Sequence, residues 1–182
     1  NVGLIGTGFM GKAHALAWNS VRPVFGDVPP VKLLHLGEAN DELAHRKAAE
    51  FGFEKASGDW KRVIADPEVD VVSITTPNTL HKEMALAAMA AGKHVHCEKP
   101  LSPSLADSLV MVEAAEKAGV ATQVGFNYIK NPLLKLARRG VKLVITVDCG
   151  IRSVQEVEDG KAYGLDIIIT DHHRADEVLP QA

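Results

Sequence analysis

The sequence predicts an α/β protein in which a doubly wound parallel sheet lies between two layers of helices. Short apolar segments alternate with helical segments along the chain, and a glycine-rich turn joins the first apolar segment to the first helix. Parallel strands require such crossover helices, and right-handed crossovers place them on both faces of the sheet.

The expected elements follow this alternation. Strands are expected at residues 1–6, 31–36, 69–75, 94–98 and 121–126, and helices at residues 12–18, 41–52, 79–92 and 104–119. The last of these helices carries Leu105, Leu109, Val112 and Ala115 on one apolar stripe. We expect the strand order 3-2-1-4-5-6 of a doubly wound sheet.

The same rhythm continues to the end of the chain. A helix is expected at residues 133–140, a strand at 142–147, a helix at 153–164 and a strand at 165–170. Pro132 can open a helix, so the expected boundary lies between a domain of residues 1–132 and a βαβ segment of residues 133–182. The short connector suits a crossover within one sheet. We therefore expect the segment to extend one edge of the sheet beyond the sixth strand, as part of one domain.

The composition is that of an ordinary globular protein. Of the 182 residues, 46% are hydrophobic and 24% are charged, with a net charge of -3. The acidic excess argues against a nucleic-acid partner, and no apolar run approaches the roughly 18 residues of a membrane span. Cys97 and Cys149 form no disulfide or metal pattern. We expect a soluble, cytoplasmic protein without a leader peptide, and the sequence leaves the oligomeric state open.

The segment GTGFMG at residues 6–11 follows a strand and opens a helix, as in a dinucleotide-binding Rossmann turn. Gly6 permits the tight turn, Gly8 lets the backbone approach a pyrophosphate, and Gly11 lets the helix pack on the strand. The N–H groups at the start of the helix would face the anion. The residues expected to bind a cofactor here are Gly6, Gly8, Phe9, Met10 and Gly11. The alternative is a glycine turn that binds nothing.

Glu38 follows the second expected strand, where an acidic residue can accept hydrogen bonds from a ribose diol. The longer first crossover, residues 21–30, explains why it lies further along than usual. A carboxylate repels a 2′-phosphate, so Glu38 favours NAD over NADP. The alternative is a solvated acid that follows a strand.

Three segments resemble the Gfo/Idh/MocA oxidoreductase family: residues 2–15, 75–101 and 124–132. The likeness runs from Asn1 to about Pro132 and implies an NAD- or NADP-dependent dehydrogenase fold. It places Lys99, in the tripeptide Glu98-Lys99-Pro100, at the hydride-transfer site. It also implies a loop that lines the nicotinamide side, formed by Thr75, Thr76, Pro77, Asn78 and His81. These positions follow strand ends, where open α/β sheets bind ligands. Without the resemblance, Lys99 reads as a surface lysine.

The C-terminal segment, residues 143–182, resembles the DHH-family phosphoesterases, closest to the RecJ-type exonucleases. That resemblance implies a manganese site at Asp148, Asp171, His172 and His173. The family's Asp-x-Asp pair has no counterpart in the sequence. A two-metal site needs several carboxylates, so we expect weak, single-ion Mn²⁺ binding at most. The alternative is a polar strand end without a metal.

Two unrelated signatures in one chain favour a chimera, engineered or recombined, and made by recombinant production. We expect such a protein to bind NAD or NADP, with NAD favoured, and not to turn over a substrate, because the resemblance supplies Lys99 without the acid and base groups of a substrate domain. The alternatives are residual Mn²⁺-dependent phosphodiesterase activity and a scaffold that binds no ligand.

Overall fold

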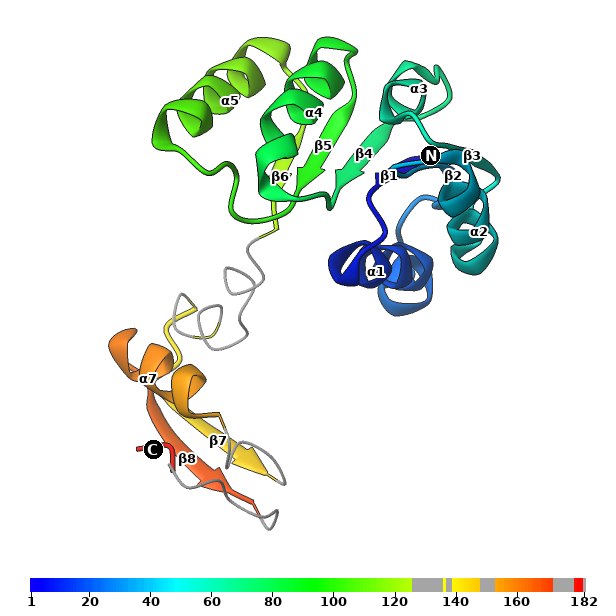
Figure 1. Ribbon diagram of the computed structural model, residues 1–182. Helices are drawn as coiled ribbons and strands as arrows, with labels where there is room; N and C mark the ends of the chain where they lie inside the picture. Colours follow the sequence, from blue (N-terminus) through cyan, green and yellow to red (C-terminus); the bar gives the residue numbers. More distant parts are fainter. Residues whose placement is uncertain (126–135, 137–138, 148–152, 172–178, 182) are drawn as a thin grey trace. The chain divides into compact units, whose positions relative to one another are not determined.

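The computed structural model describes residues 1–125, 136, 139–147, 153–171 and 179–181, and it divides into two compact units, Asn1–Gly125 and Phe126–Ala182 (Figure 1). The first unit contains a six-stranded sheet. Its strands are β1 (Val2–Ile5), β2 (Leu33–Gly37), β3 (Lys55–Ser57), β4 (Val71–Ile74), β5 (His94–Cys97) and β6 (Thr122–Val124). All pair in parallel in the order β3-β2-β1-β4-β5-β6. The predicted α/β fold is confirmed, and the strand order is that of the expected doubly wound sheet, with β3 as a strand that was not expected from the sequence.

Five helices cover the two faces of this sheet (Figure 1). They are α1 (Phe9–Phe25), α2 (Asp41–Phe51), α3 (Trp60–Ala65), α4 (Asn78–Ala90) and α5 (Leu105–Ala118). Leu4 and Leu36 pack with residues of α1 and α2 in one apolar cluster. Ile5 and Ile74 pack with α3, α4 and α5 in the other. Alternating strand residues thus supply both cores, as a sheet buried on both faces requires.

Local sequence signals explain where several helices begin and end. The Asn40 side chain accepts a hydrogen bond from the Leu43 N–H at the start of α2, and Gly52 ends that helix in a left-handed conformation with φ of 84°. Ser104 caps α5 in the same way through the Asp107 N–H. α1 runs well past the predicted residue 18 to Phe25, and Pro23 lies within it.

The apolar stripe predicted on α5 faces the core only in part. Ala115, a member of the stripe, packs against the core, whereas Leu105 is 76% exposed and Leu109 60% exposed. Met111 is the buried residue of this helix, and Ala114 packs against the same core, so the inner face includes residues beside the predicted stripe.

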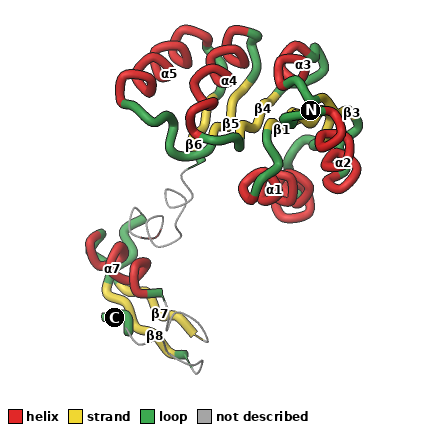
Figure 2. Tube along the Cα trace, viewed as in Figure 1, coloured by secondary structure: helices red, strands yellow, loops and turns green. Residues whose placement is uncertain are grey.

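The second unit contains a parallel strand pair, β7 (Leu143–Val147) and β8 (Asp166–Thr170), joined through α7 (Val154–Ala162) (Figure 2). Val157, Leu165 and Ile167 form its small apolar core. The predicted βαβ unit is therefore present, but its strands pair with one another in a sheet of their own. This corrects the expectation that they extend the larger sheet beyond its sixth strand. β6 has only three residues and offers few backbone groups to a further strand, while β7 and β8 pair along five.

The length and polarity of the helices decide whether any of them could cross a membrane. Across the described ranges, no helix combines the length and apolar character that crossing a bilayer requires.

A buried ion cluster supports β2 and β3 at the end away from the cleft described below. Asp66 accepts hydrogen bonds from His35 Nδ1 at 2.9 Å, Lys55 Nζ at 3.0 Å and the Glu68 N–H at 3.0 Å. Burial alone would raise the pKa of Asp66, but the hydrogen bonds from Lys55, Glu68 and His35 lower it to about 2. The cluster therefore depends on an ionised carboxylate.

Asp66→Asn should lower the free energy of unfolding by about 2 kcal/mol at neutral pH. A carboxyl whose pKa is lower in the folded state stabilises the fold above its ordinary value of 3.8, and this contribution disappears as the pH falls toward 2. Urea titrations between pH 7 and pH 2 measure the difference, with the exposed Asp27→Asn as the control. A deficit that stays constant over this range would contradict the assignment.

Candidate functional site

A cleft of about 670 Å³ opens at the carboxyl ends of β1, β2 and β4. β1 lies between β2 and β4, where the strand order reverses direction, and open α/β sheets bind ligands at such a point. The volume lies within the range of small-molecule sites. The lining residues are Ile5, Gly6, Thr7, Gly8, Phe9, Met10, Gly37, Glu38, Ala39, Gly58, Trp60, Thr75, Thr76, Pro77, Leu80 and Met84.

The glycine turn between β1 and α1 is packed tightly at its first and last glycines. Gly6 has φ of +91°, a conformation that favours glycine. A Cβ on Gly11 would lie 2.2 Å from the Gly6 carbonyl oxygen, so the helix approaches the turn as closely as backbone atoms permit. The Thr75 hydroxyl donates toward the carbonyl oxygens of Gly6 at 2.8 Å and Ile5 at 3.1 Å. β4 thus fixes the turn from the opposite wall.

Gly8 is the open position of the same turn. A Cβ built on it meets no atom within 4 Å, in contrast to Gly6 and Gly11. Gly8 is also the N-cap of α1, and no side chain caps this helix end. The first N–H groups of a helix have no partner within the helix, and they carry its positive dipole end. The turn therefore forms a cradle for an anion, with the exposed Phe9 side chain beside it.

Glu38 directly follows β2 and lies beside the glycine turn. Its Oε1 accepts hydrogen bonds from the Thr7 N–H at 2.7 Å and from the Thr7 hydroxyl, and its Oε2 accepts one from the Ala39 N–H at 2.8 Å. An ionised carboxylate can accept about four hydrogen bonds, so these three leave capacity for one further donor. The carboxylate is held rigidly against the turn and can still take a hydroxyl group.

The structure divides the remaining predicted site residues into two groups. Thr75, Thr76 and Pro77 line the cleft together with the glycine turn and Glu38. Asn78, His81, Glu98 and Lys99 do not belong to its lining. Glu98 and His81 are buried, whereas Lys99 is exposed.

Eight lining residues were missed from the sequence: Ile5, Thr7, Gly37, Ala39, Gly58, Trp60, Leu80 and Met84. Gly58 and Trp60 follow β3. This strand has only three residues and lacks the long apolar run by which a strand is recognised in a sequence. Recognition of β3 as a strand would have pointed to the residues after it, because all parallel strands end at the same edge. Leu80 lies in the first turn of α4, two residues from the predicted Asn78.

The predicted metal residues cannot be compared as a group. Asp148, His172 and His173 lie outside the described residues, and Asp171, which follows β8, is described. β7 and β8 pair in register, with Val147 opposite Thr170. No group of three or more His, Cys, Asp or Glu side chains that could hold a metal ion occurs within the described ranges.

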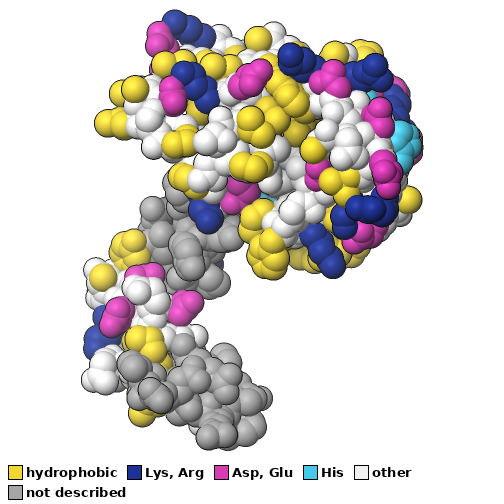
Figure 3. All heavy atoms as spheres, viewed as in Figure 1, with side chains coloured by type: hydrophobic (Ala, Val, Ile, Leu, Met, Phe, Trp, Pro, Cys, Tyr) yellow, Lys and Arg dark blue, Asp and Glu magenta, His cyan; other side chains and the backbone are white. Residues whose placement is uncertain are grey.

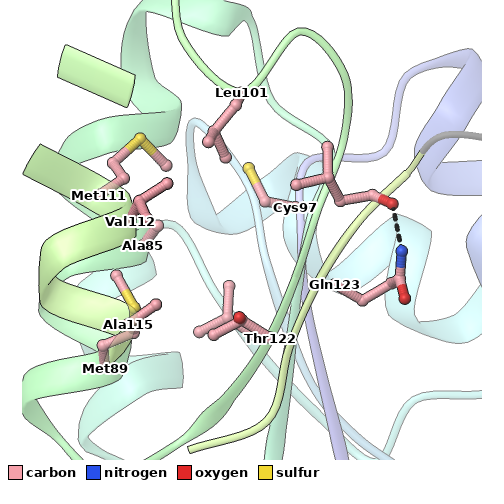
Figure 4. A pocket seen from close by; sticks show the side chains of 11 residues that line it. Ala85, Met89, Cys97, Leu101, Met111, Val112, Ala115, Thr122 and Gln123 are labelled. Atoms are coloured by element: carbon pink, nitrogen blue, oxygen red, sulfur yellow. Dashed lines mark hydrogen bonds between the residues drawn. The ribbon is translucent and has the colours of Figure 1, made fainter. Parts of the chain in front are cut away.

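A smaller cavity of about 90 Å³ lies between α4, α5 and the β5–β6 edge (Figure 4). Met111, Val112 and Ala115 face Cys97 and Thr122 across it. Burial, with a smaller contribution from Glu98, raises the pKa of the Cys97 thiol to about 12. The thiol stays protonated near neutral pH and is a poor nucleophile, so this cavity is a packing feature of the core.

The sequence of this chain is similar to those of known dehydrogenases. Residues 1–126 match the model of the Gfo/Idh/MocA oxidoreductase family, which has an NAD-binding Rossmann fold. The chain is 46% identical to levoglucosan dehydrogenase of Pseudarthrobacter phenanthrenivorans over 144 residues, covering 78% of this chain and 37% of that protein. It is 35% identical to scyllo-inositol 2-dehydrogenase (NAD(+)) of Bacillus subtilis over 138 residues, covering 76% of this chain and 39% of that protein.

Solved structures show the same relationship. An NAD binding oxidoreductase from Klebsiella pneumoniae matches with a TM-score of 0.74 and 46% identity, covering 81% of this chain and 43% of that chain. Levoglucosan dehydrogenase in complex with NADH and levoglucosan matches with a TM-score of 0.72 and 44% identity, covering 76% and 37%. The chain thus spans about two fifths of the length of these relatives. The chain belongs to the Gfo/Idh/MocA oxidoreductase family, and residues 1–126 form its NAD-binding Rossmann domain.

Proposed function

We propose that residues 1–125 bind NAD(H) in the cleft between β1, β2 and β4, as the cofactor domain of a dehydrogenase that acts on a sugar or polyol hydroxyl. The observation that carries the proposal is Gly8, an open backbone position at the uncapped start of α1. Backbone N–H groups at such a helix start bind phosphate groups. The relatives named above include dehydrogenases of levoglucosan and scyllo-inositol, which supports this substrate class.

The fit of a dinucleotide to the cleft can be followed residue by residue. The pyrophosphate would lie over Gly8 and the start of α1, and the adenosine ribose would reach the remaining acceptor position of Glu38. The nicotinamide would then extend toward Thr75, Thr76 and Pro77, with Lys99 on the neighbouring loop after β5. When bound, the nicotinamide ring supplies hydride transfer. The chain's own residues bind and orient the cofactor, and Lys99 is the proposed group beside the reacting atoms.

The charge on the surface supports a small-molecule ligand rather than a nucleic acid. On the face seen in Figure 3, basic and acidic side chains are interspersed over the described part of the first unit. The net charge of -3 points the same way, because phosphate-backbone binding requires a basic excess.

Glu38→Ala should weaken NADH binding by about tenfold or more, since hydrogen bonds to a charged group contribute roughly 1.5–3 kcal/mol. The same change should reduce the preference for NADH over NADPH, because the carboxylate no longer repels a 2′-phosphate. Calorimetric titration with both cofactors measures the two effects. Glu116→Ala, on the exposed side of α5, is the matched control. An unchanged NADH affinity in Glu38→Ala would remove Glu38 from the site.

A second proposal concerns the origin of residues 133–182: we propose that they are a separate, recombined segment derived from a DHH-type phosphoesterase. The register of β7 and β8 supports it, because Val147 and Thr170 lie opposite one another directly before Asp148 and Asp171. Carboxylates that follow neighbouring strand ends suit a hard divalent ion. With the Asp-x-Asp pair absent from the sequence, we expect no cleavage of single-stranded DNA in the presence of Mn²⁺. Cleavage that disappears in Asp171→Ala would establish the phosphoesterase activity instead.

A further inference from the structure

A buried polar cluster connects α1 to the end of β5, outside the lining of the cleft. His14, on α1, places its Nε2 2.9 Å from Glu98 Oε1 and its Nδ1 2.8 Å from Ser73 Oγ on β4. The side chains of His14 and Glu98 are only 8% and 5% exposed. Polar groups are buried at this depth only when they are paired. Direct contact with a cofactor in the cleft does not account for this cluster.

The His14 ring and its partner Ser73 make further contacts. Trp18 Nε1 donates to Ser73 Oγ at 3.5 Å, and His14 Nδ1 shares the same oxygen. An ionised carboxylate only accepts hydrogen bonds, so the contact between His14 Nε2 and Glu98 requires a proton on Nε2. His96 stacks on the His14 ring with centroids 4.6 Å apart. Burial and, to a smaller extent, His14 lower the pKa of His96, while Glu98 acts in the opposite direction.

Glu98 also contacts the backbone of the next residue, Lys99. Its Oε2 accepts a hydrogen bond from the Lys99 N–H at 3.1 Å. On the other side, a Cβ on Gly125 would lie 2.6 Å from Glu98 Oε1, so the end of β6 closes against the carboxylate. The carboxylate therefore lies between α1 and the end of β6, and it accepts a hydrogen bond from the backbone of Lys99.

A second buried histidine holds the other side of the same loop. His81, on α4, lies with Nδ1 3.0 Å from the Pro100 carbonyl oxygen and Nε2 2.9 Å from the Thr76 carbonyl oxygen. Lys99 is thus an exposed residue between Glu98 and Pro100, each of which contacts a buried histidine from a different helix.

We propose that His14 is a positioning residue for Lys99: through the Glu98 carboxylate it fixes the loop on which Lys99 stands, and His81 fixes the same loop at Pro100. This inference rests on the proposed function, which places Lys99 beside the nicotinamide. Reacting groups must be held in a defined geometry by residues behind them, and loss of that support costs activity without removing the reacting group itself. His14 also links α1, which forms the anion cradle, to the loop of Lys99.

Amide hydrogen exchange measured by NMR without cofactor tests the positioning directly. His14→Leu should accelerate exchange of the Lys99 amide by roughly tenfold, about the factor that one hydrogen bond to a charged group contributes to an equilibrium. The amides of Leu4 and Ile5 in β1 should keep their protection. His14→Gln retains an N–H donor and should restore protection of Lys99. The control His45→Leu changes an exposed histidine of α2 and should have no effect.

Should His14→Leu fail to fold, Ser73→Ala provides the same test, because it removes the hydroxyl behind His14 Nδ1 and little volume. It should accelerate Lys99 exchange in the same direction and by less. Unchanged exchange at Lys99 in a folded His14 or Ser73 variant would overturn the proposal. Acceleration spread evenly over β1 and β5 would also overturn it, since it would show that His14 stabilises the fold as a whole.

Cofactor titrations separate this inference from the proposed function. His14→Leu should weaken NADH binding while ADP-ribose, which lacks the nicotinamide, binds as it does to the parent. His14→Gln should restore NADH affinity. Equal weakening for both ligands would contradict a role confined to the Lys99 loop. If the parent binds neither ligand, the proposed function fails, and the exchange measurement still decides whether His14 holds Lys99.

Discussion

Gly8→Ala should weaken NADH binding by about 10- to 100-fold and leave the fold intact. Gly8 has φ of -65° and ψ of -163°, values that alanine adopts without strain, and its Cβ would meet no atom within 4 Å. In the complex, that methyl group would occupy the space through which the backbone approaches the pyrophosphate, and overpacking of this kind costs roughly 1–3 kcal/mol. Calorimetry gives the affinity, and thermal unfolding gives the stability.

Gly11→Ala is the contrasting variant in the same turn. Its Cβ would lie 2.2 Å from the Gly6 carbonyl oxygen and 3.0 Å from Thr75 Oγ1, so the backbone itself would have to move. We expect Gly11→Ala to lower both stability and NADH affinity, whereas Gly8→Ala lowers affinity alone. A Gly8→Ala protein that binds NADH with the parent's affinity would show that the pyrophosphate does not lie over this turn.

The 182-residue chain should bind NADH without oxidising levoglucosan, aldoses or polyols at a detectable rate. Glu38 is the one ionisable side chain among the residues that line the cleft, and it lies at the end of β2 that the ribose would occupy. Hydride transfer also needs a proton acceptor held against the substrate hydroxyl, and such positioning lowers the barrier by about 7–11 kcal/mol. Lys99, exposed after β5, does not supply that arrangement by itself.

The assay follows the absorbance of NADH during incubation of NAD with a panel of these substrates. Lys99→Ala and the exposed Lys117→Ala serve as matched variants. Turnover that is lost in Lys99→Ala and kept in Lys117→Ala would show that the chain is an active dehydrogenase, and it would contradict this prediction.

The parts of the fold that were predictable are those with long, repetitive signals. The buried strands β1, β2 and β4 are largely apolar, and α2 has an asparagine cap and a glycine end. Such segments specify their own conformation, so the sheet and its helical layers follow from the sequence. β3 and α3 were missed because they are short, and in β3 only Ser57 is buried.

The candidate site was predictable where backbone geometry dictates residue type. Gly6 and Gly11 must be glycine for reasons of conformation and space, and the turn therefore carries a sequence signature. The cluster of His14, Ser73 and Glu98 has no such sequence signature. Ser73 lies 59 positions and Glu98 84 positions after His14, and the three residues meet only through the tertiary fold. For the same reason the separate pairing of β7 with β8 could not be read from a strand–helix rhythm that fits one sheet or two.

Calorimetric titration of the unmodified chain with NADH and NADPH tests the central claim most directly. The open Gly8 at the start of α1 and the anchored Glu38 carboxylate predict saturable binding of NADH, and weaker binding of NADPH because Glu38 repels its 2′-phosphate. No heat from either cofactor at millimolar concentration would contradict the account.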